Sequence, residues 1–173
     1  PFVAKMMADR LDHEKICGTA FTYPLSVEKY IDYFVTSAGD KNKRLCFKYL
    51  CDDVPVGMTS YTRIDRRNDY GHIGLVAIDP MLRGAGHGEN MINEILKLGF
   101  ETHRFNRIDL VVIESNTMGY QFYVNKIGFR DEGLIRDILK VKDGYLSWHS
   151  LSMIKSEWAN KAIQSDAFGA ADL

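Results

Sequence analysis

The chain has 173 residues, a length typical of one domain, and 46% of them are hydrophobic, which is enough to bury a core. Its 22 basic and 23 acidic residues leave a net charge of −1, whereas nucleic-acid-binding proteins usually carry a basic excess, so the composition predicts no nucleic-acid partner. The sequence has no apolar run of about 18 residues and no cysteine pair at metal-ligand spacing, which predicts no membrane span, no metal site and a reduced, cytoplasmic protein.

Hydrophobic periodicity and turn residues predict helices and strands that alternate along the chain. The predicted elements are, in chain order, a helix capped by Ser26, strands over Leu45–Cys51, Pro55–Ile64 and Tyr70–Ile78, a helix that ends near His103, a strand over Arg107–Glu114, a helix from Ser115 or Asn116 to Lys126, and strands over Phe129–Lys140 and Tyr145–Ile154. This order predicts one α/β domain over residues 1–173, with a mixed, mainly antiparallel sheet flanked by helices. Residues 159–173 are rich in alanine and small polar side chains and are expected to form a loose tail.

A glycine-rich loop lies between the third predicted strand and the helix that follows it. Its residues are Arg83, Gly84, Ala85, Gly86, His87 and Gly88. Glycines let backbone N–H groups approach a ligand closely, and the start of a helix adds positive potential. Arg83 adds a charge at the rim. The pattern therefore favours an anion site suited to a pyrophosphate.

Two other phosphate-binding motifs, the dinucleotide fingerprint and the Walker loop, do not fit the residues of this loop. The dinucleotide fingerprint needs Gly-x-Gly-x-x-Gly and an acidic residue at the end of the next strand. Here the glycines read Gly84-x-Gly86-x-Gly88, and Asp109 lies near the start of its strand. The Walker loop needs Gly-Lys-Ser or Gly-Lys-Thr, which this loop lacks. A tight turn without a ligand stays open as the third interpretation.

The stretch Val76–Gly88 resembles the acetyl-CoA signature of the GNAT superfamily of N-acetyltransferases. The core of that signature is Arg/Gln-x-x-Gly-x-Gly/Ala, and Arg83, Gly86 and Gly88 fill it here. The later run from Asn116 through Tyr123 to Phe129 is similar to a second hallmark of the superfamily. Two stretches resemble the subgroup that contains ribosomal-protein alanine acetyltransferases, and they are Gly128–Leu134 and Met153–Trp158. The resemblance covers residues 22–158.

This resemblance implies a sheet that is splayed between its fourth and fifth strands, here Tyr70–Ile78 and Arg107–Glu114. It also implies acetyl-CoA as the co-substrate, with the pantetheine amides bonded by the backbone of Val76 and Ile78 and the pyrophosphate held by the loop Arg83–Gly88. Asn116 is expected to reach the pantetheine arm or to act only as a helix N-cap. Dimerisation with a second copy is in keeping with the family.

The activity that the resemblance implies is transfer of an acetyl group to a primary amine. A peptide N-terminus, which the subgroup favours, a polyamine and another small amine are the candidate substrates. The alternative is an acyl-CoA-binding or sensor module without catalysis, which would keep the glycine loop and lose the groups that transfer protons.

The proposed chemistry is direct attack of the amine on the thioester, which needs a base because a lysine-like amine has a pKa near 10.4. His72 is the candidate base, since a histidine is largely neutral at pH 7, and Glu114 is the second choice. Tyr123 is the candidate acid for the departing thiolate, with Tyr120 as a substitute, and the N–H of Ile78 is a candidate oxyanion donor. The competing interpretations are a structural strand histidine and a packed helix aromatic.

One spacing departs from the family pattern. The helix tyrosine usually lies four residues before the glycine of the Gly-Phe pair, whereas Tyr123 lies five residues before Gly128. Counting forward from Asn116 places Tyr123 in the expected position, and counting back from Gly128 places Val124 there. One extra residue must therefore be accommodated within this helix.

Overall fold

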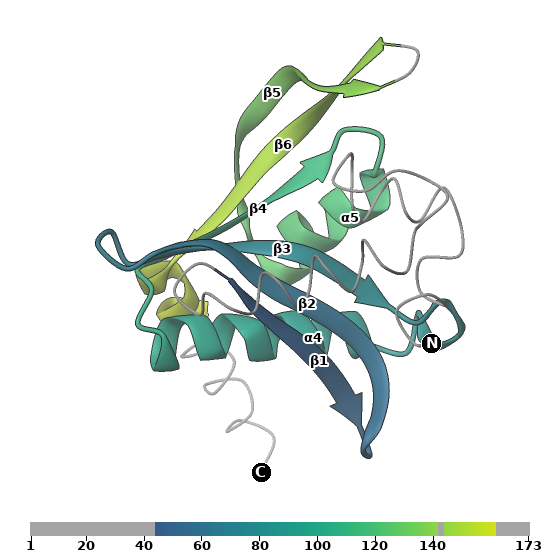
Figure 1. Ribbon diagram of the computed structural model, residues 1–173, viewed down its shortest axis with the longest axis vertical. Coiled ribbons are helices and arrows are strands. Elements are labelled where there is room, and N and C mark those ends of the chain that lie inside the picture. The colour runs from purple at the N-terminus through teal and green to yellow at the C-terminus, as the bar shows by residue number, and fades with distance from the viewer. Residues whose placement is uncertain (1–43, 142–143, 162–173) are drawn as a thin grey trace.

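The computed structural model describes residues 44–141 and 144–161. Within these ranges the chain forms a six-stranded sheet of order β1-β2-β3-β4-β6-β5, in which only β3 and β4 are parallel neighbours (Figure 1). The strands are β1 (Leu45–Cys51), β2 (Val54–Asp65), β3 (Tyr70–Ile78), β4 (Arg107–Ile113), β5 (Arg130–Val141) and β6 (Gly144–Ile154). Each predicted strand is confirmed with both ends within one residue, and so is the mixed, mainly antiparallel sheet. The helix predicted from Ser26 lies outside the described residues.

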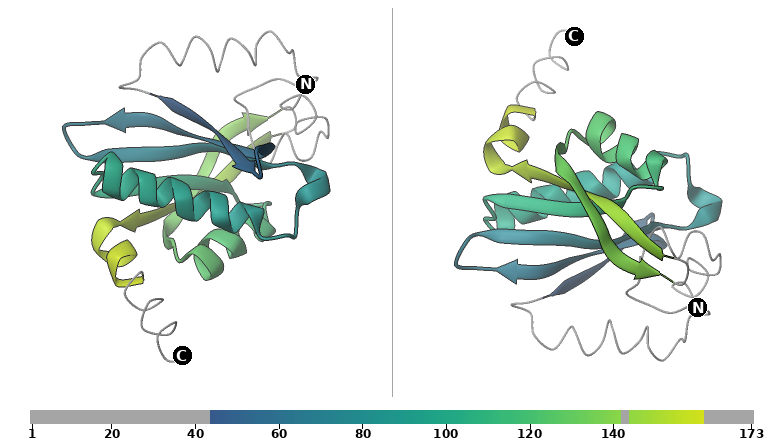
Figure 2. Two further views of the ribbon diagram at one scale, coloured as in Figure 1. Left: turned by 90° about the horizontal axis from the view of Figure 1, so that it is seen from below. Right: turned by 90° about the horizontal axis from the view of Figure 1, so that it is seen from above.

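Helix α4 (His87–Lys97) covers one face of the sheet, and Figure 2 shows α4 and the later helix α5 on the same side. The buried side chains of α4 recur at helical spacing, and they are Met91, Ile92, Ile95 and Leu96. The π-helical turn η3 (Leu98–Thr102) continues the helix to His103, as predicted. Burial of this apolar stripe against the sheet fixes the position of α4, and therefore of the glycine loop that begins it.

The main core lies between this face of the sheet and the helices. Its largest fully buried side chains come from β2, η3 and the segment after it, and they include Tyr61, Phe100 and Phe105. The hydroxyl of Tyr61 donates to the carbonyl of Ile95 at 2.6 Å, so the one polar atom of this ring is satisfied. A Cβ at Gly99 would lie 2.2 Å from that hydroxyl, which is why the helix passes Tyr61 with a glycine.

Strands β3 and β4 separate after a short paired stretch. They pair only over Tyr70–His72 with Arg107–Asp109, and beyond that point Figure 1 shows the two strands diverging. A bulge in β3 accompanies the separation, because the four residues from Ile73 to Val76 oppose the three from Thr59 to Tyr61 on β2. The splay expected between the family's fourth and fifth strands is confirmed. We call the opening the wedge, and the last paired residues, His72 and Asp109, its vertex.

The helix after β4 accommodates the extra residue in its sequence by widening. Helix α5 (Thr117–Gln121) runs into the π-helical turn η4 (Phe122–Ile127), in which the N–H of Gly128 donates to the carbonyl of Tyr123. A π-helical turn contains one more residue than an α-helical turn. Gly128 then ends the helix in the left-handed conformation at φ 87°, as predicted.

The C-terminal segment departs from expectation. A loose tail was predicted from residue 159, but residues 155–161 form a helix that follows β6 directly. Trp158 packs beside Phe100 with ring centroids 5.5 Å apart, and Nζ of Lys161 donates to the carbonyl of Ile127 at 2.6 Å. The tail prediction is therefore wrong for residues 159–161, because these contacts attach the helix to the core. Residues 162–173 lie outside the described part of the chain.

Candidate functional site: the wedge between β3 and β4

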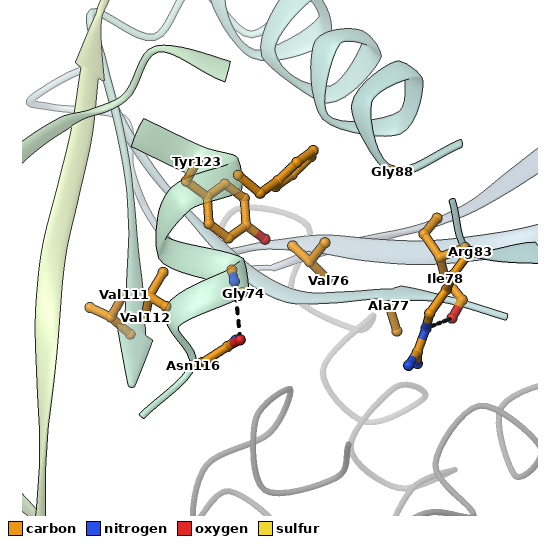
Figure 3. Close-up of a pocket in the computed structure, with 12 residues that line it drawn as sticks. Gly74, Val76, Ala77, Ile78, Arg83, Gly88, Val111, Val112, Asn116 and Tyr123 are labelled. Atoms are coloured by element: carbon orange, nitrogen blue, oxygen red, sulfur yellow. Dashed lines mark hydrogen bonds between the residues drawn. The ribbon is translucent and has the colours of Figure 1, made fainter. Parts of the chain in front are cut away.

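The wedge is a cleft with a volume of about 290 Å³. Figure 3 shows β3 along one side of it and β4, α5 and η4 along the other. The lining residues named in that view are Gly74, Val76, Ala77, Ile78, Arg83, Gly88, Val111, Val112, Asn116 and Tyr123. Residues from the predicted glycine loop, the third strand and the second hallmark therefore meet in one cleft.

The edge of β3 that faces the wedge presents backbone polar groups. The N–H of Asp79 donates to the carbonyl of Val56 on β2 at 2.9 Å, and backbone groups alternate in direction along a strand. Ala77 therefore faces β2, whereas the N–H and C=O of Val76 and Ile78 point into the opening. The carbonyl of Ile78 accepts a hydrogen bond from Nε of Arg83 at 3.2 Å, which lies on the wedge side as well (Figure 3).

The glycine loop lies at the open end of the wedge. Gly84 and Gly86 adopt φ angles of 82° and 83°, which side chains disfavour, and a Cβ at either position would meet nothing within 4 Å. Gly86 is the N-cap of α4 and makes no side-chain cap, so the first N–H groups of the helix point to the loop unassisted. His87 begins the helix, and its ring lies edge-on to Tyr49. An open backbone cradle at a helix N-terminus suits a phosphate group.

Asn116 and Tyr123 line the side of the wedge opposite β3. Oδ1 of Asn116 accepts a hydrogen bond from the N–H of Gly119 at 3.1 Å, so this side chain caps α5, and its amide NH₂ group remains for a second contact. Tyr123 directs its hydroxyl toward Val76 (Figure 3). Burial raises the pKa of the Tyr123 phenol above its usual value, so the group keeps its proton at neutral pH.

His72 lies at the vertex, buried on the sheet face that points away from α4. Its Nδ1 lies 2.6 Å from Oδ1 of Asp109 on β4 and 2.6 Å from Nη2 of Arg63 on β2. The hydroxyl of Tyr70 donates to the same Asp109 oxygen at 2.8 Å. His72 is not among the residues that line the cleft, but it lies two residues before Gly74, where the lining begins.

The two substitute candidates lie elsewhere. Glu114 is exposed at the end of β4, where its N–H donates to the carbonyl of Ser147 at 3.0 Å, and its side chain does not line the cleft. The hydroxyl of Tyr120 donates to Asp131 at 2.8 Å, on the side of α5 that faces β5 and β6. The structure thus places Tyr123 in the lining of the cleft, whereas His72, Glu114 and Tyr120 lie beside it.

Sequence reasoning missed Asp109 at the vertex and the two residues that contact the vertex, which are Arg63 and Tyr70. Asp109 was considered only as the acidic residue of a dinucleotide fingerprint, at the wrong end of its strand. It lies 37 residues from its partner His72, and no motif joins the two. A usable signal was the polar residue at the start of an otherwise apolar strand, since buried carboxylates need partners.

Comparison with known proteins places the fold and the site in a family. A model of the acetyltransferase (GNAT) family matches residues 10–129. This chain belongs to the GNAT family. The Bacillus licheniformis protein named uncharacterized N-acetyltransferase p20 is 28% identical over 107 residues, which are 62% of this chain and 59% of that protein. The match thus spans less than two thirds of that relative's length.

Solved structures share the GNAT fold of this chain. The spermidine N-acetyltransferase of Vibrio cholerae in complex with CoA and spermine superposes with a TM-score of 0.77 at 17% identity, covering 91% of this chain and 90% of that one. A probable acetyltransferase superposes with a TM-score of 0.67 at 25% identity, covering 79% of this chain and 78% of that one. At 17% identity, the likeness to the Vibrio cholerae structure shows only that the two chains share a fold.

The GNAT family binds acetyl-CoA, and the residues of the wedge fit that molecule. The loop that contains Gly84 and Gly86 is an open cradle for phosphates, and the exposed edge of β3 can bond an extended chain of amides as a neighbouring strand would. Within residues 44–141 and 144–161, no helix is long and apolar enough to cross a membrane.

Proposed function

We propose that this protein transfers an acetyl group from acetyl-CoA to a primary amine in the wedge between β3 and β4. The observation that supports this most directly is the early separation of these strands, which pair over three residues and then leave the polar edge of β3 open. If β3 and β4 paired along their whole length, the backbone N–H and C=O groups on this edge of β3 would be hydrogen-bonded to β4. The amine is a peptide N-terminus, a polyamine or another small amine.

The binding roles follow from the position of each group along the wedge. The loop Arg83–Gly88 would hold the pyrophosphate at the open end, and the backbone of Val76 and Ile78 would bond the pantetheine amides. The NH₂ group of Asn116 would donate to a pantetheine carbonyl from the other side, while its Oδ1 continues to cap α5. Acetyl-CoA supplies the activated acyl group, and the wedge would place that group near the bulge in β3.

The reaction requires the amine to lose a proton and the thiolate to gain one. The amine nitrogen forms a C–N bond with the thioester carbon as the C–S bond breaks. His72 would take the amine proton through a water molecule, and the Tyr123 hydroxyl would protonate the thiolate. Glu114 stays the second candidate for the base, because its side chain is exposed at the end of β4, whereas His72 is buried where β3 and β4 separate.

The oxyanion donor is better assigned to Val76 than to Ile78. Six residues separate His72 from Ile78, which is about 20 Å of strand, so the two cannot act on the same carbonyl carbon. The N–H of Val76 lies nearer the vertex and also points into the wedge. We therefore propose that the N–H of Val76 meets the oxyanion, which leaves the Val76 carbonyl and the Ile78 backbone to bond the pantetheine amides.

A thiol-release assay with a panel of amines tests the function. Purified protein and acetyl-CoA are mixed with peptides that have free N-termini, with spermidine and spermine, and with small amines, and the free thiol of CoA is followed with a thiol reagent. We expect release with at least one class of amine. Tight acetyl-CoA binding with no release across the whole panel would instead support the acyl-CoA-binding module. Polyamines enter the panel because the fold relatives include a spermidine N-acetyltransferase.

A glycine substitution tests the placement of the pyrophosphate. Gly86→Glu adds bulk and negative charge at the cradle and should abolish acetyl-CoA binding in calorimetry. Gly133→Glu is the matched control, since Gly133 has φ 126° and open space around a Cβ but lies on β5, away from the cleft. Equal affinities for the two variants would show that the loop does not hold the phosphates.

A further inference from the structure

We infer that Asp109 is a positioning residue that holds His72 with its proton on Nδ1, so that Nε2 is the nitrogen that accepts the amine proton. The inference rests on the proposed function, because it assigns Asp109 to orient the residue that is proposed there as the base. It also implies that the amine enters from the sheet face away from α4 and α5.

The location of the pair supports this assignment. Neighbouring side chains on a strand point to opposite faces, and Ile108 and Leu110 are in the core with α4. Asp109 and Val111 therefore lie on the other face, together with His72. Val111 lines the wedge, so the pair borders the cleft at its narrow end. The acetyl-CoA groups assigned above use the face of α5, which leaves the opposite face for the second substrate.

The hydrogen-bonding chemistry selects one tautomer of His72. Asp109 is an acceptor when ionised and Arg63 is only a donor, and both lie 2.6 Å from Nδ1. A proton on Nδ1 satisfies the carboxylate, whereas a lone pair there would repel it. Asp109 is held between two strands and cannot withdraw, but the exposed Arg63 side chain can rotate away or turn to the carboxylate. The carboxylate therefore determines the tautomer.

The remaining ring nitrogen is free to act. No hydrogen bond to Nε2 of His72 is found within the described residues. The His72 side chain is 8% exposed, so the ring is not fully closed off from water. An Nε2 without a partner among the described residues is the arrangement that a base needs to receive a proton through water.

The charged groups around the pair come from three strands. Arg63 faces it from β2, Tyr70 and His72 lie on β3, and Arg107 is next to Asp109 on β4. Burial acts to raise the pKa of Asp109, but the hydrogen bonds from His72 and the Tyr70 hydroxyl and the Arg63 charge hold it below its usual value. Asp109 is thus ionised near neutral pH, where the base must work.

Two measurements test the inference, the first on Asp109→Asn and the second on the wild type. The first measurement is the pH dependence of kcat/KM, whose acid limb reports the ionisation of the base in the free enzyme. Loss of the carboxylate should move the midpoint of this limb to a pH about one unit lower, since an opposite charge typically shifts a pKa by about 1–3 units. The variant should also lose kcat, by less than the about 10²–10⁴-fold expected from losing the base itself, with the KM for acetyl-CoA unchanged. Asp109→Glu should restore part of the rate.

The second measurement needs no turnover. Nitrogen chemical shifts of His72 should show the proton on Nδ1 in the wild type. If Asp109→Asn does not fold, the wild-type spectrum decides alone. An Nε2–H tautomer, or an acid limb that stays in place, would overturn the inference. Failure of the wild type to release thiol with any amine would instead refute the proposed function, so the two failures are distinguishable.

A matched control lies elsewhere in the molecule. Asp131 accepts a hydrogen bond from the Tyr120 hydroxyl and lies 3.0 Å from Nδ1 of His149, so Asp131→Asn makes the same chemical change in the same kind of cluster. The acid limb should stay in place in this variant. A shift of equal size in both variants would mean that the effect on catalysis is a general consequence of losing a carboxylate, and would overturn the role of Asp109.

Discussion

Two clusters of the same composition occupy different places in this protein. In each, an aspartate accepts a hydrogen bond from a tyrosine hydroxyl at 2.8 Å and lies against Nδ1 of a histidine, at 2.6 Å for Asp109 and 3.0 Å for Asp131. The first cluster is Tyr70, Asp109 and His72, and the second is Tyr120, Asp131 and His149.

The surroundings of the clusters differ more than their chemistry. The side chains of His72 and Asp109 are 8% and 16% exposed, whereas those of His149 and Asp131 are 25% and 27% exposed. The first pair joins β3 to β4 where the sheet opens. The second attaches α5 to β5 and β6, with the rings of Tyr120 and His149 4.5 Å apart. The two clusters therefore share their hydrogen-bonding chemistry but differ in burial and in whether a cleft lies beside them.

The largest expected difference between the clusters is in turnover. His72→Ala should lower kcat by about 10²–10⁴-fold, because the general base is lost, while acetyl-CoA still binds. His149→Ala should act on stability instead, since it removes a partly buried contact with Asp131 and a ring contact with Tyr120. Steady-state kinetics across pH 6 to 9 with calorimetry for acetyl-CoA compares the two. Near-normal turnover in His72→Ala would show that His72 is not the base and that the positioning of the two substrates alone accounts for the rate.

The two tyrosines of the α5–η4 segment sharpen the comparison. Tyr123 directs its hydroxyl into the wedge, whereas the Tyr120 hydroxyl is bound to Asp131. We expect Tyr123→Phe to lower kcat by about 10²-fold, the low end of the range for a general acid, and Tyr120→Phe to lower it less. Single-turnover rates with saturating acetyl-CoA measure this. A larger loss in Tyr120→Phe would reassign the acid to Tyr120.

The smallest expected difference is in the pH dependence of stability. Against the effect of burial, hydrogen bonds and nearby charges hold the pKa values of Asp109 and Asp131 below their usual range. A carboxyl of this kind stabilises the folded state above its unfolded pKa, near 3.9, and the stabilisation is lost as the pH falls through the folded pKa. Near pH 7, Asp109→Asn should therefore cost about 1–3 kcal/mol, and Asp131→Asn at most about 1 kcal/mol.

The difference in the free energy of unfolding between the wild type and each variant should become smaller as the pH falls from about 5 to below the folded pKa values. The reason is that the wild type then loses the same interaction by protonation. Urea unfolding of the three proteins at pH 7 and pH 3 tests this. A deficit in Asp109→Asn that does not change with pH would show that packing of the side chain, and not its charge, stabilises the vertex.

Local sequence patterns were enough to predict most of the elements. Alternating apolar residues and the turns at Asp52 and Asp65 delimited β1, β2 and β3, and Gly128 marked a helix end, because each of these signals acts over a few residues of chain. The glycine loop was predicted as an anion site for the same reason, since backbone freedom at Gly84 and Gly86 is a local property.

The sequence by itself determined the order of the elements, the glycine loop and the two candidate groups His72 and Tyr123. Only the tertiary structure decided that His72 meets Asp109, that β3 and β4 separate after three residue pairs, and that a π-helical turn directs Tyr123 into the wedge. The physical reason is that β3 and β4 are parallel neighbours joined through α4, so the packing of that helix on the sheet sets their register. The pattern of apolar residues within one strand does not predict which residue of the neighbouring strand each of its residues will face.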